Sequence, residues 1–165
     1  KFYKLNNLKK IQDPMLELGR FCVDPNYKDP KIIMTAWSAI RKLVEKNKIK
    51  FLFGCSSFIG TSIDRYLDCF KFLKTKYIAP KKYNLYVKAP KVFKFNNLIN
   101  LNNFCLKKAK KNLPPLLSFY LNLGGWVSDH VVIDYDLETM HVFTGLEVKE
   151  IPEKRLQFLY KINLN

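Results

Sequence analysis

The stretch MLELGRFCVDPNYKDP, from Met15 to Pro30, is the part of the sequence that decides the fold. Its first part is mostly apolar and lies between Asp13-Pro14 and Asp24-Pro25, so we predict a strand from Met15 to Val23. Gly19 inside that run predicts a bulge or the close approach of another backbone. The final pair, Asp29-Pro30, is typical of a helix start, because aspartate caps free amides and proline fits the first turn.

The residues that follow complete a unit with this strand. From Lys31 to Asn47 apolar residues recur at the spacing of one helix face, and Phe51 to Phe58 is an apolar run of strand length. Strand, helix and strand in this order predict two parallel strands joined by a right-handed crossover. If such strands splay apart, their free amides can pair with an extended ligand. The helix N-terminus between them suits a phosphate, and Lys28 and Lys31 add positive charge there.

The rest of the chain predicts further elements around this unit. Periodicity indicates two more helices, from Ser62 to Lys76 and from Leu116 to Leu123. Turn residues indicate a hairpin of two strands, from Trp126 to Ile133 and from Met140 to Lys149. Residues 80–112 are rich in Lys and Asn and are predicted to be a basic, partly irregular excursion with a short strand at Val92 to Phe95. We predict one domain over residues 1–150 and a C-terminal tail over 151–165.

Composition narrows the classes of protein and partner. The chain has 165 residues, with 29 Lys and Arg against 14 Asp and Glu, which favours an acidic partner: nucleic acid, an anionic lipid surface or an acidic protein. The four cysteines are widely spaced, which is typical of a reducing cytosol and not of a disulfide framework. The two histidines, His130 and His141, do not have metal-ligand spacing. We expect both to be exposed on the hairpin and give them no role.

Several ordered motifs resemble one family. The stretch from Glu17 to Tyr27 resembles the E-x-x-R-x-x-V-x-P-x-Y pattern of the ornithine-acyl carrier protein N-acyltransferases, which are hemolysin-like members of the GNAT superfamily. The similarity continues through these segments: LFGCSSF (52–58), YIAP (77–80), LPPLL (113–117), YLNLG (120–124), DYD (134–136) and Thr139. It spans the chain from Glu17 to Val148 and is weakest in the Lys/Asn-rich excursion.

The resemblance implies an α/β (α+β) fold of GNAT type. We expect a mixed, mostly antiparallel sheet with a central, splayed pair of parallel strands and flanking helices. The family places several strands and helices before the E-x-x-R strand, so we expect this chain to be N-terminally truncated. The usual GNAT pyrophosphate loop is glycine-rich, whereas this chain has Lys28-Asp29-Pro30-Lys31. A single phosphopantetheine phosphate needs a smaller cradle, which favours acyl carrier protein over CoA as the donor.

The activity that the resemblance implies is N-acyl transfer. A (3-hydroxy)acyl group would pass from acyl-phosphopantetheine to the α-amine of ornithine in ornithine lipid biosynthesis, with no permanently bound cofactor and no metal. The expected partners are acidic acyl carrier protein, ornithine and an anionic membrane surface, and the expected location is the cytoplasm or the inner face of the membrane. Lysines of the excursion are the predicted docking surface, although coding bias would also enrich them: Lys81, Lys82, Lys88, Lys91, Lys94, Lys107, Lys108, Lys110 and Lys111.

Two residues receive catalytic roles from the resemblance. Glu17 would be the base that frees the amine, and Tyr120, four residues before Gly124, would protonate the leaving thiolate. A Glu17–Arg20 pair on a solvated sheet face and a core tyrosine beside Phe119 are the structural alternatives. A second set is predicted to bind donor and substrate: Arg20 would clamp a carboxylate, and the main chain of Phe21, Cys22 and Val23 would pair with the donor arm. Lys28 and Lys31 would contact the phosphate, and the hydroxyls of Ser56 and Ser57 would bond the pantetheine amides. Serines at a strand end are also ordinary turn formers.

Three other functions stay open. The same fold could use another donor or amine, such as acetyl-CoA or a homoserine lactone-type substrate. The chain could also be an inactive remnant that binds lipid or protein. A nucleic-acid-binding module is disfavoured, because no such motif is present and the aromatic residues follow core periodicity.

Overall fold

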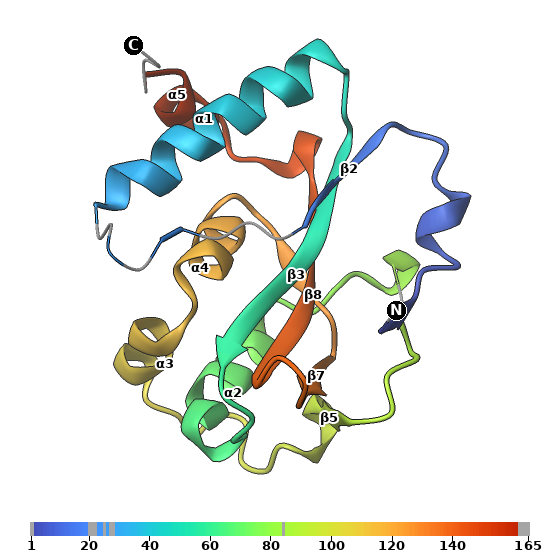
Figure 1. Cartoon of the computed structure of the whole chain (residues 1–165), viewed down its shortest axis with the longest axis vertical. Helices are drawn as coiled ribbons and strands as arrows, with labels where there is room; N and C mark the ends of the chain where they lie inside the picture. The colour runs from blue at the N-terminus through green and yellow to red at the C-terminus, as the bar shows by residue number, and fades with distance from the viewer. Residues whose placement is uncertain (1, 20–22, 25, 27–28, 84, 162–165) are drawn as a thin grey trace.

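The computed structural model describes residues 2–19, 23–24, 26, 29–83 and 85–161. Its centre is a six-stranded sheet in the order β2-β3-β8-β7-β5 (Figure 1), and β6 also pairs with β8. All neighbours except β2 and β3 are antiparallel, so the sheet is mixed and mostly antiparallel, as predicted. The strands are β2 (Met15–Leu18), β3 (Phe51–Ile59), β5 (Val92–Lys94), β6 (Trp126–Val127), β7 (His130–Asp134) and β8 (Thr139–Glu147).

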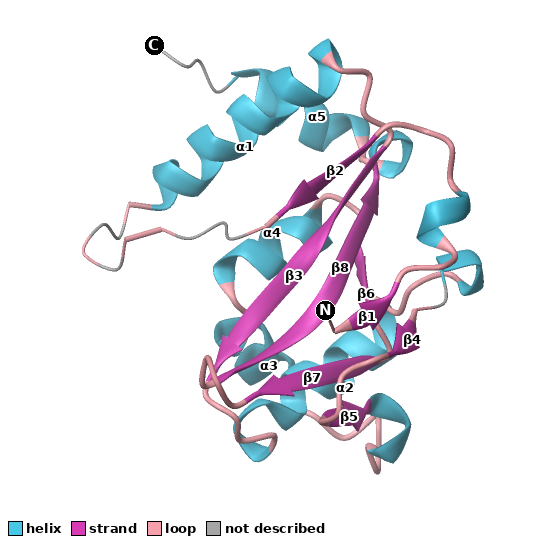
Figure 2. Cartoon of the chain, turned by 45° about the vertical axis from the view of Figure 1, so that its right-hand side comes forward, coloured by secondary structure: helices cyan, strands magenta, loops and turns pink. Residues whose placement is uncertain are grey.

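The predicted strand-helix-strand unit is β2, α1 (Pro30–Lys46) and β3. The two strands are parallel and pair from Met15 with Phe51 to Leu18 with Gly54. Beyond Gly54, β3 continues to Ile59 and, among the described residues, pairs there only with β8. Figure 2 shows β2 turning away from β3 where the pairing stops. The pair lies at one edge of the described sheet and not at its centre, because β2 is the outermost strand.

The start of α1 follows the predicted capping chemistry. The Asp29 side chain is the N-cap and accepts a hydrogen bond from the backbone N–H of Lys31 at 2.8 Å, with proline in the first turn. Trp37 and Val44 on the inner face of α1 are buried against Leu52 of β3. The helix is therefore held by its cap and by one apolar face, as expected for an amphipathic helix.

The helices cover one face of the sheet. Alternate residues of β3 and β8 on that face, such as Leu52, Phe58 and Leu146, join two apolar clusters with the helices. Those helices are α1, α2 (Leu67–Lys76), α3 (Leu106–Asn112), α4 (Pro115–Asn122) and α5 (Glu153–Lys161). Helix α3 lies within the excursion predicted to be irregular. Helix α5 lies in the predicted tail and packs on α1, with Leu159 only 3% exposed.

The N-terminal segment covers part of the opposite face. A small sheet of β1 (Tyr3–Lys4) and β4 (Tyr86–Val87) lies there, above stacked aromatic rings that include Phe51, Trp126 and Phe143. Further along β3, Cys55, Ser57 and Ile59 on this face are exposed. We call this side, which carries Glu17, Cys55 and Ser57, the open face.

The predicted hairpin is present, with one interruption. The strand expected from Trp126 to Ile133 breaks between β6 and β7, where Ser128 Oγ accepts from the Phe143 N–H at 3.1 Å and donates to the His130 carbonyl at 2.7 Å. The hydroxyl thus takes the Phe143 N–H over the break, while the Ser128 N–H still donates to the Phe143 carbonyl at 2.9 Å. Among the described residues, none of the helices has the length and apolarity needed to cross a bilayer.

The expectation that both histidines are exposed was wrong. His130 is 0% exposed and His141 is 5% exposed. Both rings project from the hairpin toward the N-terminal segment, and the ring of Tyr3 packs on each of them, with centroids 5.4 and 5.8 Å away. A segment far away in the sequence therefore buries them.

Candidate functional site

The candidate site is the place where β2 and β3 part. A continuous sheet separates side chains on its two faces, but a gap between two strands lets groups from both faces approach one point. Here the gap opens beside Cys55, the first β3 residue past the last β2 pair at Gly54. Gly54 permits the close approach before the gap, since a Cβ there would lie 2.5 Å from the Leu18 carbonyl oxygen.

A cleft of about 520 Å³ follows this edge of β3 toward the β7–β8 turn. Its floor is formed by β3, one wall by the start of α4, and the other by the hairpin. The lining residues used below are Cys55, Ser57, Leu116, Asp134, Leu137 and His141. The cleft is large enough for an extended chain and brings apolar and polar groups together, as binding clefts commonly do.

Glu17 lies on the open face beside the parting. It pairs in register with Phe53 of β3, and its side chain is exposed. Its neighbours Leu16 and Leu18 point the other way, into the cluster under α1. The carboxylate is thus accessible on the side that the helices leave uncovered.

Tyr120 approaches from the opposite, helix-covered side. It is 2% exposed on α4, and Trp37 meets its ring edge-on, with centroids 4.9 Å apart. Its hydroxyl is enclosed and has no hydrogen-bond partner in the described chain. Burial, and then the nearby Cys55 thiol, raise the pKa of Tyr120 well above its ordinary value, so the phenol stays protonated. A buried, unpaired hydroxyl costs free energy, which requires an explanation in function or in a bound ligand.

Cys55 connects these two groups. The protein around the cleft, and secondarily the Glu17 carboxylate, raise the pKa of its thiol to about 11. The same thiol acts on the pKa of Tyr120. Cys55 is therefore within electrostatic reach of Glu17 on one face and of Tyr120 on the other, although it is exposed as a residue. It lies on the uncovered face because the odd-numbered residues of β3 beyond Gly54 point to that side.

The two serines predicted to bind the donor have different environments. Ser56 is 2% exposed and its hydroxyl is hydrogen-bonded to that of Thr144 at 3.0 Å, so it stabilises the β3–β8 pair. Ser57 is exposed on the open face and lines the cleft. Of the two, only Ser57 presents its side chain to a ligand on that face.

The predicted phosphate site at the start of α1 is partly occupied by the protein itself. Asp29 places a carboxylate at the first free amide, its carbonyl accepts from the Ile32 N–H, and Pro30 has no N–H to offer. Lys31 is exposed and can still contribute charge. Four other predicted binding residues lie outside the described residues: Arg20, Phe21, Cys22 and Lys28. Val23 is described and half-buried, but it is not part of a strand.

Sequence reasoning missed two residues of the cleft. His141 and Asp134 both line it, and burial lowers the pKa of His141, so the ring is uncharged at neutral pH. The D-x-D motif pointed to Asp134, but only as a turn residue. No local signal places His141 in a cleft, because its position depends on strand pairing. Among the described residues there is no group of three or more His, Cys, Asp or Glu side chains that could hold a metal ion.

Comparison with known proteins finds matches of one kind. Residues 1–38 match the family model described as an acetyltransferase (GNAT) domain. The chain is 28% identical over 156 residues to the L-ornithine N(alpha)-acyltransferase of Rhodobacter capsulatus, a match that covers 94% of this chain and 59% of that relative. It is 28% identical over 144 residues to the L-ornithine N(alpha)-acyltransferase of Brucella abortus, covering 87% of this chain and 51% of the relative.

A third relative extends the same pattern. The L-ornithine N(alpha)-acyltransferase of Agrobacterium fabrum is 25% identical over 143 residues, with 87% of this chain and 48% of the relative covered. The chain therefore spans about half the length of the curated relatives that it matches. No solved structure matches it significantly. The resemblance predicted from the motifs is confirmed: the chain is similar to the L-ornithine N(alpha)-acyltransferases over most of its length, and its first 38 residues match a GNAT acetyltransferase domain.

Proposed function

We propose that this protein transfers a (3-hydroxy)acyl group from the phosphopantetheine arm of acyl carrier protein to the α-amine of ornithine, the first acylation in the synthesis of an ornithine lipid. The observation that carries the proposal is the Tyr120 hydroxyl, which is buried and unpaired beside the parting of β2 and β3. A leaving thiolate in the gap would give this hydroxyl the partner that it lacks.

The chemistry needs a base, a stabilised oxyanion and an acid. An ornithine α-ammonium must lose a proton before its nitrogen can attack the thioester carbon. Glu17 is exposed on the open face beside the gap and is our candidate for that step. Main-chain amides on the edge of β3 beyond Gly54, which no described strand pairs with on that side, suit the oxyanion. As the C–S bond breaks, the sulfur takes the electron pair and then the proton of Tyr120, whose raised pKa keeps it in the acid form. The second proton that the attacking nitrogen loses on becoming an amide returns to Tyr120 and restores the phenol.

The donor would enter along the edge of β3 past α4. The cleft wall formed by Pro114, Pro115 and Leu116 is apolar and suits an acyl chain. Lys31 at the start of α1 is placed for a phosphate. The Asp29 carboxylate already takes the first free amide and Pro30 has no N–H, so few amides remain there for a phosphate, and a single phosphopantetheine phosphate needs fewer of them than the CoA pyrophosphate.

Two acidic partners fit the surface charge. Helix α3 exposes Lys107, Lys110 and Lys111, and the chain as a whole carries +15, so we propose that acyl carrier protein docks on this helix. Peripheral contact with an anionic membrane is part of the same proposal. Ile59, the last residue of β3, and Leu137, in the neighbouring β7–β8 turn, are 74% and 72% exposed at the end of the cleft, where a lipid product would leave.

The direct test is acyl transfer with defined substrates. We would incubate the protein with 3-hydroxyacyl-acyl carrier protein and ornithine and follow the amide product by mass spectrometry. Parallel reactions would contain the same acyl group on CoA, acetyl-CoA, and lysine or homoserine in place of ornithine. Product from the carrier-protein thioester and ornithine supports the proposal. Exclusive use of acetyl-CoA, or no amide with any donor, would overturn it.

A further inference from the structure

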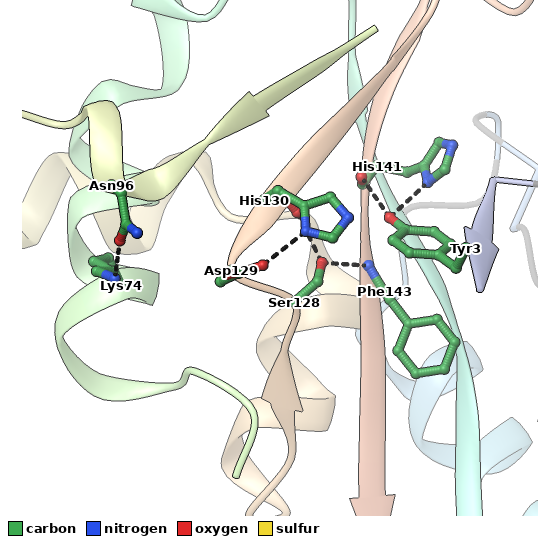
Figure 3. A network of polar contacts seen from close by, with 8 residues as sticks. All are labelled: Tyr3, Lys74, Asn96, Ser128, Asp129, His130, His141 and Phe143. Carbon is green, nitrogen blue, oxygen red and sulfur yellow. Dashed lines mark hydrogen bonds and ion pairs between the residues drawn. The ribbon is translucent and has the colours of Figure 1, made fainter. Parts of the chain in front are cut away.

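His141 lines the cleft and packs against residues from a distant part of the chain. The Phe2 ring lies against the imidazole with centroids 5.0 Å apart, and the Tyr3 ring meets it edge-on at 5.8 Å. Its strand partner in register is Ser57 of β3, which lines the same cleft. Figure 3 shows the imidazole with Nδ1 toward the Tyr3 hydroxyl and the second ring nitrogen pointing away from it.

The hydrogen bonds of Tyr3 determine which ring nitrogen of His141 carries the proton. The Tyr3 hydroxyl donates its only proton to the His141 backbone carbonyl at 3.1 Å. Its oxygen lies 3.3 Å from Nδ1 of the same histidine. The contact to the carbonyl is the shorter of the two, so we assign the hydroxyl proton to it; the oxygen then accepts at Nδ1, and Nδ1 bears the hydrogen. In a neutral imidazole the other nitrogen, Nε2, is then the unprotonated one.

The unprotonated nitrogen is accessible from the cleft. Within the described part of the chain Nε2 of His141 has no partner, and it is not among the fully enclosed polar atoms. Nε2 of His130, in contrast, is enclosed. The two histidines lie on the same face, yet only one of them presents a basic nitrogen to a ligand.

The groups that face His141 keep it neutral and favour a cation beside it. Burial is the main cause that lowers its pKa, His130 on β7 acts in the same direction, and Asp134 on β7 opposes them. From β1 it faces Tyr3, and from β3 it faces Ser57, with Cys55 further along the same cleft. Asp134 is 7% exposed and places a carboxylate in the cleft wall, which suits an ammonium group.

We propose that the cleft wall formed by His141, Ser57 and Asp134 is a binding site for the primary amine of the acceptor, with His141 Nε2 accepting its proton. The inference rests on the proposed function and deepens it, because it assigns the acceptor side of the same cleft. The ammonium N–H bond breaks, the proton moves to Nε2 and on to solvent, and the neutral nitrogen keeps the electron pair that forms the new C–N bond. Glu17 is the competing base, on the other strand of the parting.

The binding step can be tested without any turnover. The chain has only two histidines, so His130→Gln assigns the imidazole signals of a uniformly ¹⁵N-labelled sample. Long-range ¹H–¹⁵N spectra should show His141 protonated at Nδ1 and titrating below pH 6.5, and Tyr3→Phe should change that tautomer. Ornithine added alone, up to millimolar concentration, should shift the Nε2 resonance of His141 and leave that of His130 in place. Protonation at Nε2, or no shift at saturating ornithine, would overturn the proposal.

Kinetics then separate this proposal from the acyl-transfer proposal. With a carrier-protein thioester and ornithine, His141→Gln should lower kcat about 10²-fold, the scale of one general base, and should leave the KM for the donor unchanged. It should also remove the acidic limb of the kcat/KM profile, whereas His130→Gln should retain the rate and the acidic limb, with the limb moved to higher pH because His130 lowers the pKa of His141. If His141→Gln leaves the pH profile of kcat/KM unchanged, this inference is refuted and the acyl-transfer proposal stands. Ornithine shifts at His141 without any acyl transfer would instead refute the proposed function and leave the amine site standing.

Discussion

Replacing Tyr120 by phenylalanine should make the protein more stable and less active. The hydroxyl of Tyr120 is enclosed without a partner, and a buried polar group in that state costs about 1–3 kcal/mol. Phenylalanine retains the ring, and with it the contact with Trp37, while removing the unpaired oxygen. We therefore expect Tyr120→Phe to raise the free energy of unfolding by about 1 kcal/mol. For a chain of this size that corresponds to roughly 2–4 °C in Tm.

The same substitution should remove the acid of the reaction. Loss of one positioned proton donor typically lowers a rate by roughly 10²–10⁴-fold, and we expect kcat for amide formation to fall within that range. Urea unfolding followed by tryptophan fluorescence measures the stability, and mass spectrometry of the amide product measures the rate. A gain in stability together with a loss of activity is the expected signature of a group retained for function.

Tyr66 provides a matched control. It is 6% exposed, and its hydroxyl donates to the Ile59 carbonyl at 3.0 Å, so it has the partner that Tyr120 lacks. Tyr66→Phe should lower stability by about 1 kcal/mol and leave the rate unchanged. The reasoning fails if Tyr120→Phe is destabilised like the control, or if it keeps the full rate of amide formation.

Three further predictions concern the parting, the helix cap and the cleft. Gly54→Ala places a Cβ 2.5 Å from the Leu18 carbonyl oxygen, so we expect β2 and β3 to be pushed apart and the free energy of unfolding to fall by about 1–3 kcal/mol. An unchanged midpoint of urea unfolding would contradict this. Asp29→Ala should cost about 1 kcal/mol of stability through loss of the α1 cap, measured in the same way, and equal stability would show that the cap contributes nothing. The thiolate is the reactive form and the pKa of Cys55 is raised to about 11, so its alkylation rate, measured by mass spectrometry of the modified thiol, should keep rising above pH 9. Because the Glu17 carboxylate contributes to that raised pKa, Glu17→Gln should speed alkylation at a given pH. A rate that reaches a plateau near pH 8 would refute this.

The candidate site joins groups that a closed sheet would keep apart. Tyr120 belongs to the helix-covered side and Glu17 to the open face, and both interact with the thiol at Cys55. A sheet paired along the whole of β3 would leave no passage between them. The register, which ends at Gly54, therefore determines whether these residues can serve one reaction.

Part of the site was predictable because its signals are local. An Asp-Pro pair before an apolar helical face predicts a capped helix, and the structure has that cap at Asp29. Tyr120 and Glu17 were named only because ordered motifs resemble a known family, since composition and periodicity are equally consistent with a core tyrosine and a surface pair. The different environments of Ser56 and Ser57 follow from strand alternation, but the sequence does not tell which face the helices cover.

The amino-acid sequence by itself determined the strand-helix-strand unit, the hairpin and the family relationship, because each is encoded in spacings of a few residues. Tertiary structure alone decided that His130 and His141 are buried, that α5 packs on α1, and that the cleft has a histidine in its wall. The physical reason is range. Side-chain direction repeats every two residues in a strand and every 3.6 in a helix, whereas the contact that orients His141 comes from Tyr3, 138 residues away in the chain.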